Sequence, residues 1–326
     1  MTMLSRRTLL AVVLPTLAAG LARAEGPSDY PTRPVTFIVP YAPDGGTDTL
    51  GHLLGEELQE RLGQPFMVQN RPGEGTIIAT NFVAKSPPDG YTIMMAVSTL
   101  AIDVTLYKTL PYNPVKDLAL LAVVASVPFI LVVNPALPVY GVDDLIKLAK
   151  QKALSFGSGG IGAFHHLAAE LFAHMTGIKL RHVPYRGTAP ALKDLVAGYI
   201  QLMFTDYGPA ASLINSGKLR PLAVTTTTAL AVLPNVPPLA EAGVPGFDLA
   251  AWQGVVAPGK TPSVIVDKLN AQINAIVGEP DVRGRLHDLG MKPLGKGDPN
   301  ELASFLKSEI VRWGKIVEMA GIAKSE

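Results

Sequence analysis

The chain has 326 residues, 48% of them hydrophobic and only 6% aromatic, and its formal net charge is +1. A near-neutral chain without a dense run of Lys and Arg lacks the electrostatic footprint of a protein that binds nucleic acid or anionic membrane. Because it has no Cys, the sequence excludes disulfides and the acylated Cys of a lipoprotein.

The N-terminus has the three parts of a secretory signal. Residues 1–7 include Arg6 and Arg7, residues 8–21 are almost wholly apolar, and residues 22–24 form an A-x-A pattern. We expect residues 1–24 to be a signal peptide, cleaved after Ala24, and the mature protein to be periplasmic. The paired arginines also resemble a twin-arginine signal, and both that route and general export stay open.

A membrane anchor is the weaker interpretation of this terminus. The apolar run has 14 residues and contains Pro15 and Gly20, whereas a helix needs about 20 to cross a bilayer. Residues 119–135 come closest to spanning length in the remaining chain, but Pro128 and Pro135 interrupt them. Removal of residues 1–24 leaves 25 basic and 27 acidic side chains, a formal charge of −2.

From residue 35 the chain alternates between short strands and helices. Early strands are expected at residues 35–40, 66–69 and 91–96, with helices at the leucine stripe of residues 50–62 and at 79–85. Later strands are expected at 154–156, 180–184, 200–204 and 222–226, and helices at 145–150, 163–176, 189–197, 209–215, 264–277, 281–289 and 301–319. This rhythm predicts an α/β protein with parallel sheets covered by helices on both faces.

A mature chain of about 300 residues usually forms two compact lobes. We place the crossovers near residues 127–134 and 250–257, so that lobe one has residues 30–129 plus 254–326 and lobe two has residues 130–253. Ligands of open α/β sheets bind beyond the carboxyl ends of the strands. The sequence therefore predicts a ligand cleft between the lobes, closed by a hinge motion.

Residues 40–48 join a predicted strand to a helix N-terminus. Gly45 and Gly46 would let an anion approach free backbone N–H groups, and Thr47 or Asp48 would cap the helix. An ordinary loop with a helix cap would show the same residues. The candidate ligand-binding residues here are Tyr41, Ala42, Pro43, Gly45, Gly46, Thr47 and Asp48.

A second glycine-rich loop spans residues 157–163, between a predicted strand and a predicted helix. It offers a bare cradle of N–H groups for an anion, although a flexible turn is the alternative. It lacks the Lys-Ser/Thr of a P-loop, so nucleotide binding is not expected. The candidate residues are Ser158, Gly159, Gly160, Ile161, Gly162 and Ala163.

His166, Glu170 and His174 share one face of the following helix at i, i+4 and i+8. That spacing would suit a metal, but the H-E-x-x-H pattern is missing, so we favour a packed His–Glu face and expect no metal. His166 is kept among the candidate ligand-binding residues.

Three further loops follow the carboxyl ends of predicted strands and so reach the predicted cleft. They carry Ser98 and Thr99, then Tyr185, Gly187 and Thr188, and finally Thr205 and Asp206. Thr188 would cap the next helix, and Arg186 could pair with a carboxylate, although an Arg at a loop rim is more often solvated. The sequence has no G-x-S-x-G motif, no Cys nucleophile and no carboxylate pair at catalytic spacing, so we expect neither an enzyme nor a cofactor.

Ten short segments of the mature chain form one ordered pattern. They are YP…RPV…VPY in residues 30–41, GGTD at 45–48, QNRPG at 69–73, PPDGYT at 87–92, LPY at 110–112, HL…ELF at 166–172, HVPYRG at 182–187, GKLR…LAV at 217–224, EAG…PG at 241–246 and RW at 312–313. This pattern resembles the periplasmic solute-binding proteins of tripartite tricarboxylate transporters, the Bug or TctC family, over essentially the whole mature chain.

The resemblance implies a two-lobed type II periplasmic binding protein, or Venus flytrap, for a small carboxylate: a di- or tricarboxylate, an aromatic acid or an acidic amino acid. It implies binding through backbone amides and ordered waters, at loops that correspond to residues 45–48 and 157–163, with Tyr41 as an aromatic contact. It also implies a monomer whose partner is a membrane permease. A sensor that feeds a signalling membrane protein shares the fold and stays the alternative.

Two loops depart from the family pattern. Asp44 stands where a small residue usually precedes the glycines, and residues 72–76, Pro-Gly-Glu-Gly-Thr, replace a loop usually built of Gly and Ala. Either departure would alter the ligand size or favour a ligand with a cationic or hydroxyl group.

Overall fold

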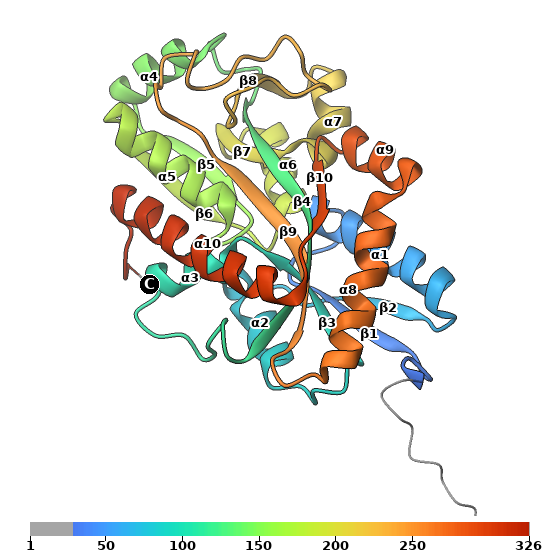
Figure 1. Ribbon diagram of the computed structural model, residues 1–326. Helices are drawn as coiled ribbons and strands as arrows, with labels where there is room; N and C mark the ends of the chain where they lie inside the picture. The colour runs from blue at the N-terminus through green and yellow to red at the C-terminus, as the bar shows by residue number, and fades with distance from the viewer. Residues whose placement is uncertain (1–28, 326) are drawn as a thin grey trace, which may run out of the picture.

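The computed structural model describes residues 29–325, so the predicted signal peptide of residues 1–24 lies outside the described residues. Two lobes, one above the other, share a ten-stranded sheet, and helices pack against it (Figure 1). The order of the strands along the main path is β2-β1-β3-β9-β4-β7-β5-β6, and β8 and β10 both pair with β4.

Each lobe has a set of parallel strands at its outer end. In lobe one, β1 (Val35–Val39) pairs in parallel with β2 (Phe66–Asn70) and β3 (Thr92–Val97). In lobe two, β5 (Leu154–Ser158) pairs in parallel with β6 (Leu180–Pro184) and β7 (Leu202–Asp206). These are strands that the sequence pattern predicted, and their loops lead toward the interface between the lobes.

Two long antiparallel strands join the lobes, β4 (Leu118–Val133) and β9 (Ala250–Pro258). β4 pairs with β9 as far as Pro128 and with β7 from Phe129 onward, so this single strand belongs to both lobes. β8 (Arg220–Val224) and β10 (Lys292–Lys296) also pair antiparallel with β4. The sheet is therefore mixed where a parallel one was expected, because the chain passes between the lobes in both directions through neighbouring strands. The predicted boundaries at 129/130 and 253/254 stay predictions.

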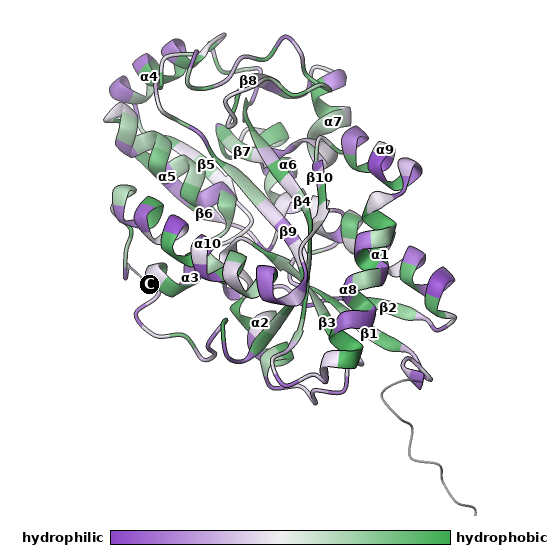
Figure 2. Cartoon of the chain, in the orientation of Figure 1, coloured by the Kyte–Doolittle hydropathy of each residue, from purple (hydrophilic) through white to green (hydrophobic). Residues whose placement is uncertain are grey.

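Helices cover both faces of the sheet, with their apolar sides turned inward and their polar sides outward (Figure 2). Lobe one has α1 (Gly46–Leu62), α2 (Ile77–Ala84), α3 (Thr99–Leu106), α8 (Ser263–Gly278), α9 (Pro280–Asp288) and α10 (Pro299–Met319). Lobe two has α4 (Val142–Gln151), α5 (Phe164–Thr176), α6 (Thr188–Ala197) and α7 (Tyr207–Asn215). Within residues 29–325, no helix combines the length and apolarity needed to cross a membrane.

The C-terminal helix α10 packs along α3 and reaches lobe two. A capping box formed by Asp298 and Glu301 fixes its first turn. Near its end, the Trp313 ring meets the Phe164 ring of α5 edge-on, with 5.7 Å between ring centroids. Trp313 is fully buried, and its indole N–H donates to the Glu309 carboxylate at 2.7 Å. α10 thus adds a second physical connection between the lobes, beside the shared strands.

Candidate functional site

The N-termini of five helices, α1, α3, α5, α6 and α7, converge on a cavity of about 30 Å³ between the lobes, here called the inner cavity. None of these five described helices has a hydrogen bond to its own N-cap side chain. Their first-turn N–H groups and the positive ends of their dipoles make the cavity an environment for an anion. Its wall includes Tyr41, Gly45, Gly46, Thr47, Ser98, Thr99, Phe129, Phe164, His165, Thr188, Asp206, Trp252 and Gln253.

The lobes are closed around the inner cavity. The Ala42 N–H donates to the Arg186 carbonyl of the other lobe at 2.9 Å, and a Cβ added to Gly187 would lie only 3.2 Å from the Ala42 nitrogen. The inner cavity has room for about two water molecules, which is far less than an organic acid needs. An acid therefore reaches this wall only when the lobes move apart.

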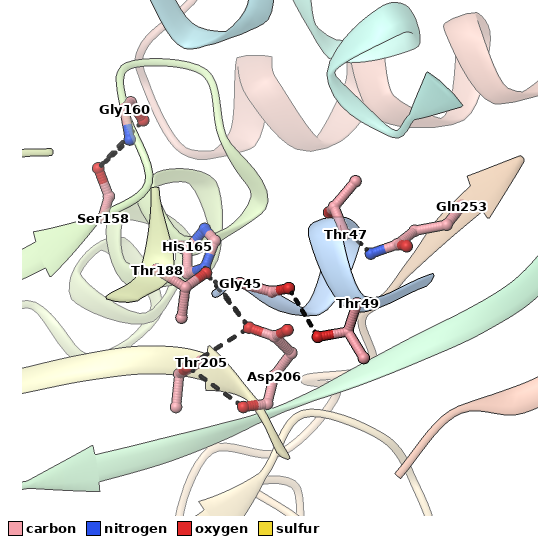
Figure 3. A network of polar contacts seen from close by, with 10 residues as sticks. All are labelled: Gly45, Thr47, Thr49, Ser158, Gly160, His165, Thr188, Thr205, Asp206 and Gln253. Atoms are coloured by element: carbon pink, nitrogen blue, oxygen red, sulfur yellow. Dashed lines mark hydrogen bonds and ion pairs between the residues drawn. The ribbon is translucent and has the colours of Figure 1, made fainter. Parts of the chain in front are cut away.

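Asp206 brings a carboxylate into the inner cavity. It ends β7, is only 4% exposed and faces the first turn of α1, where a Cβ on Gly46 would collide with its Oδ2 (Figure 3). The hydroxyls of Thr188 and Thr205 donate to Oδ1 at 3.4 and 3.5 Å, which are long hydrogen bonds. Burial raises the pKa of Asp206 to about 6, against the effect of hydrogen bonds from its own N–H, Thr188, Thr205 and the Gly46 N–H.

His165, the second residue of α5, lies beside this carboxylate. Its Nε2 is 3.1 Å from the Thr188 hydroxyl and 3.9 Å from Asp206 Oδ1. Burial lowers the pKa of His165 to about 3, so the ring is neutral near pH 7 and does not neutralise Asp206. Its Nδ1 is buried without a hydrogen-bond partner among residues 29–325. Sequence reasoning singled out His166 instead, although a polar residue in the first turn after a glycine-rich loop was a usable signal.

Gln253 was not predicted and comes from the middle of β9. Its Nε2 donates to the Thr47 hydroxyl at 3.0 Å, while its Oε1 is buried with no partner in the described chain. The neighbouring Trp252 N–H donates to the Ser98 hydroxyl at 2.8 Å and so fixes β9 against the start of α3. No local motif marks either residue, since only the pairing of β9 with β3 brings them to the cavity.

A larger outer cavity of about 690 Å³ adjoins the inner one, and Tyr41 lines both. Its wall combines the lobe-one loop of residues 73–76 with the predicted cradle residues Gly159, Gly160 and Ile161 and with Tyr185. The two loops touch, because a Cβ on Gly75 would collide with the Ile161 carbonyl oxygen. The glycine loop of lobe two thus reaches the outer cavity, and the first turn of α5 behind it reaches the inner one.

Nine predicted residues lie in the wall of neither cavity, namely Ala42, Pro43, Asp48, Ser158, Gly162, Ala163, His166, Gly187 and Thr205. The Ser158 hydroxyl bonds within lobe two, 2.6 Å from His182 Nε2. The His166 ring stacks on His182 with centroids 4.0 Å apart, and its Nε2 lies 3.7 Å from Glu170. No group of three His, Cys, Asp or Glu residues suited to a metal occurs in the described part of the chain.

The helix caps differ from the expected ones. Gly45 occupies the N-cap of α1, and Asp48 instead accepts from the Asp44 N–H at 3.0 Å and from the Asn70 amide at 2.6 Å. Gly187 occupies the N-cap of α6, which turns the Thr188 hydroxyl toward His165 and Asp206. These corrections have one cause: where the helix starts with glycine, the polar side chains are free to shape the loop and the cavity wall. Asp44 is exposed and lines neither cavity.

Two lobes joined by shared strands and closed over a small polar cavity are the architecture of a solute-binding protein. Residues 52–322 match the family model described as tripartite tricarboxylate transporter family receptor, TctC. The chain belongs to this family, as the ordered motifs predicted. The family consists of solute-binding proteins, so the chain is a binding protein and not an enzyme.

Relatives and solved structures agree with this assignment. Protein BugT of Bordetella pertussis is 36% identical over 318 residues, which are 96% of this chain and 97% of BugT. The structure of R. palustris Rpa4515 with adipate is similar with a TM-score of 0.87 and 40% identity, over 90% of this chain and 99% of that one. The periplasmic binding protein BugD gives a TM-score of 0.87 at 32% identity, over 90% and 99% of the two chains. These neighbours confirm the predicted two-lobed fold.

Proposed function

We propose that this protein captures a small organic carboxylate in the periplasm and delivers it to a membrane permease of the tripartite tricarboxylate type. The observation that carries the proposal is the convergence of five helix N-termini without side-chain caps on one cavity. No Lys or Arg among residues 29–325 lines that cavity, so its donors are uncharged groups, backbone N–H groups and hydroxyls among them. Support also comes from Rpa4515, solved with adipate, and from MatC of Rhodopseudomonas palustris, solved with bound malate.

Backbone donors suit a carboxylate because its two oxygens can accept several N–H groups at once. Hydrogen bonds to a charged group are each worth about 1.5–3 kcal/mol. Closure of the lobes would exclude water and strengthen every one of them. Ligand would then select the closed arrangement through contacts that both lobes supply.

The test compares acids with their uncharged analogues. We expect at least one mono-, di- or tricarboxylate or aromatic acid to raise the unfolding midpoint, since a ligand that binds only the folded state stabilises it by RT ln(1 + [L]/Kd). The corresponding amide should bind at least ~10-fold more weakly in calorimetric titration, the loss of about one charge-assisted hydrogen bond. Equal affinity for acid and amide, or no bound acid in the whole screen, would contradict the proposal.

Export and partner are tested separately. The mature protein should begin at Glu25 and be found in the periplasm, and material that retains residues 1–24 there would contradict cleavage. Vesicles that contain the permease should accumulate the acid only when loaded monomeric receptor is added. The sensor alternative predicts binding to a signalling membrane protein and no uptake.

A further inference from the structure

One part of the inner cavity wall presents hydrogen-bond acceptors, in contrast to the helix N-termini around it. Asp206 is 4% exposed and Gln253 is 6% exposed, and both line this cavity. Gln253 Oε1 has no partner among residues 29–325, with its amide nitrogen already committed to Thr47. Unsatisfied acceptors this deeply buried are rare in folded proteins and indicate a partner that arrives from outside.

The charge of Asp206 is also without a cationic partner. Its nearest basic group is His165, at 3.9 Å, and burial keeps that ring neutral near pH 7. No Lys or Arg of the described chain forms an ion pair with Asp206. A buried carboxylate is ordinarily paired with a cation, because desolvation of an unpaired charge is unfavourable.

The donors that do reach Asp206 satisfy it only weakly. The Thr188 and Thr205 hydroxyls both approach Oδ1, at 3.4 and 3.5 Å, and Oδ2 lies over Gly46 at the start of α1. A carboxylate can accept about four hydrogen bonds, and two of the four that reach Asp206 are long and weak, so a stronger donor in the cavity can replace them. A second ionised carboxylate placed there would instead be repelled by a like charge.

We propose that the ligand is an organic acid that carries a second, hydrogen-bond-donating group, an ammonium or a hydroxyl, and that Asp206 and Gln253 accept from this group. The inference rests on the proposed function, which places the ligand carboxylate at the helix N-termini. An ammonium is the stronger partner of the two, because it also supplies the positive charge that no described side chain gives Asp206. The site would thereby select substituted acids over plain ones of the same length.

The test is a calorimetric comparison of matched acids near pH 7. The probes are succinate, malate and aspartate; glutarate, 2-hydroxyglutarate and glutamate; and adipate and 2-aminoadipate. In at least one series the wild-type protein should bind the amino or hydroxy acid at least ~10-fold more tightly than the plain acid. Asp206→Asn should remove that preference, whereas the charge-matched control Asp267→Asn, at an exposed position of α8, should keep it.

Wild-type protein that binds plain acids as tightly as substituted ones overturns the inference, and so does a preference that survives Asp206→Asn. Circular dichroism checks that the variants fold; if Asp206→Asn does not, Gln253→Met carries the same comparison, since it removes the other acceptor. Failure of every probe also overturns the inference, while binding of a different acid in the wider screen leaves the proposed function standing.

Discussion

The carboxylate of Asp206 couples proton binding to stability. Burial raises its folded-state pKa to about 6, from the ordinary value of 3.8. For an acid with a raised folded pKa, the neutral form contributes stability below about pH 3.8, and this contribution is lost as the pH rises through about 6. His165 and His182 act in the opposite sense, because burial lowers the pKa of each to about 3 and acid therefore favours their unfolded, charged forms.

Asp206→Asn isolates the effect of the acid from that of the histidines. As the pH rises from 4 to 7, we expect the unfolding free energy of the variant to increase by about 2–3 kcal/mol relative to that of wild type, because wild type must bury a charge at the higher pH. Urea unfolding of both proteins at pH 4, 5, 6 and 7 measures this difference. Stability curves that run parallel over the whole range would show that the Asp206 carboxylate is not buried in solution.

Residues of the site were predictable where they lie in loops that follow parallel strands. Gly46 and Thr188 were found this way, because the carboxyl ends of strands and the starts of helices can be located from the chain alone. Gln253 could not be found in this way, because its place in the cavity depends on the antiparallel pairing of β9 with β3, in which Gln253 pairs with Val97, 156 residues earlier in the chain. Thr205 was also predicted as a ligand-binding residue. It lies behind the cavity wall, where its hydroxyl donates to the Asp206 carboxylate.

The lobe-one loop at residues 73–76 has an unusual backbone for its sequence. Glu74, Gly75 and Thr76 have φ angles of 46°, 65° and 121°, in the region that L residues rarely adopt. The loop contains the 3-10 turn η2 (Glu74–Thr76) and presses against Ile161 of lobe two. Strained backbone of this kind persists only where the surroundings hold it, and here the surroundings include the opposite lobe.

Gly75→Ala tests whether this contact is needed for closure. The added Cβ would meet the Ile161 carbonyl, so we expect affinity for the bound acid to fall at least ~10-fold, measured by calorimetry. The left-handed backbone alone should cost about 1–2 kcal/mol of stability. Gly63→Ala is the matched control, since Gly63 has φ +70° and no neighbour within 4 Å. If both variants lose stability equally and neither loses affinity, the loop contact plays no part in closure.

Strands and helices in the βα repeats were predicted nearly as they occur, because each buries an apolar run between turn residues. The prediction failed where the regular alternation of strand and helix breaks down. β10 (Lys292–Lys296) contains Pro293 and Gly295, which do not read as a strand, and α3 has only eight residues. β9 was expected only as a crossover, yet it forms a full strand at the centre of the sheet.

At the scale of the molecule, the small inner cavity requires that the lobes open and close. A compact chain of about 300 residues has a radius of gyration near ~19 Å. We expect the ligand-free protein in solution to have a larger radius of gyration than the ligand-saturated protein, measured by small-angle X-ray scattering. Gly75→Ala should keep the larger radius when the acid is added. Identical scattering of free and saturated wild-type protein would contradict a hinge.

Pro128 of β4 and Ala250 of β9 are paired residues, and they lie within the predicted crossovers at residues 127–134 and 250–257. Residues 129–249 are therefore an insert whose two ends are neighbours in one antiparallel ladder. An insert with adjacent ends can be exchanged between relatives as a cassette, without rerouting the rest of the chain. Chimeras made at these two points would keep the six helices of lobe one, the whole strands β1, β2, β3, β9 and β10, and β4 as far as Pro128, and would replace one half of the cavity wall. Such exchanges would turn the receptor into a scaffold for building sensors of other acids.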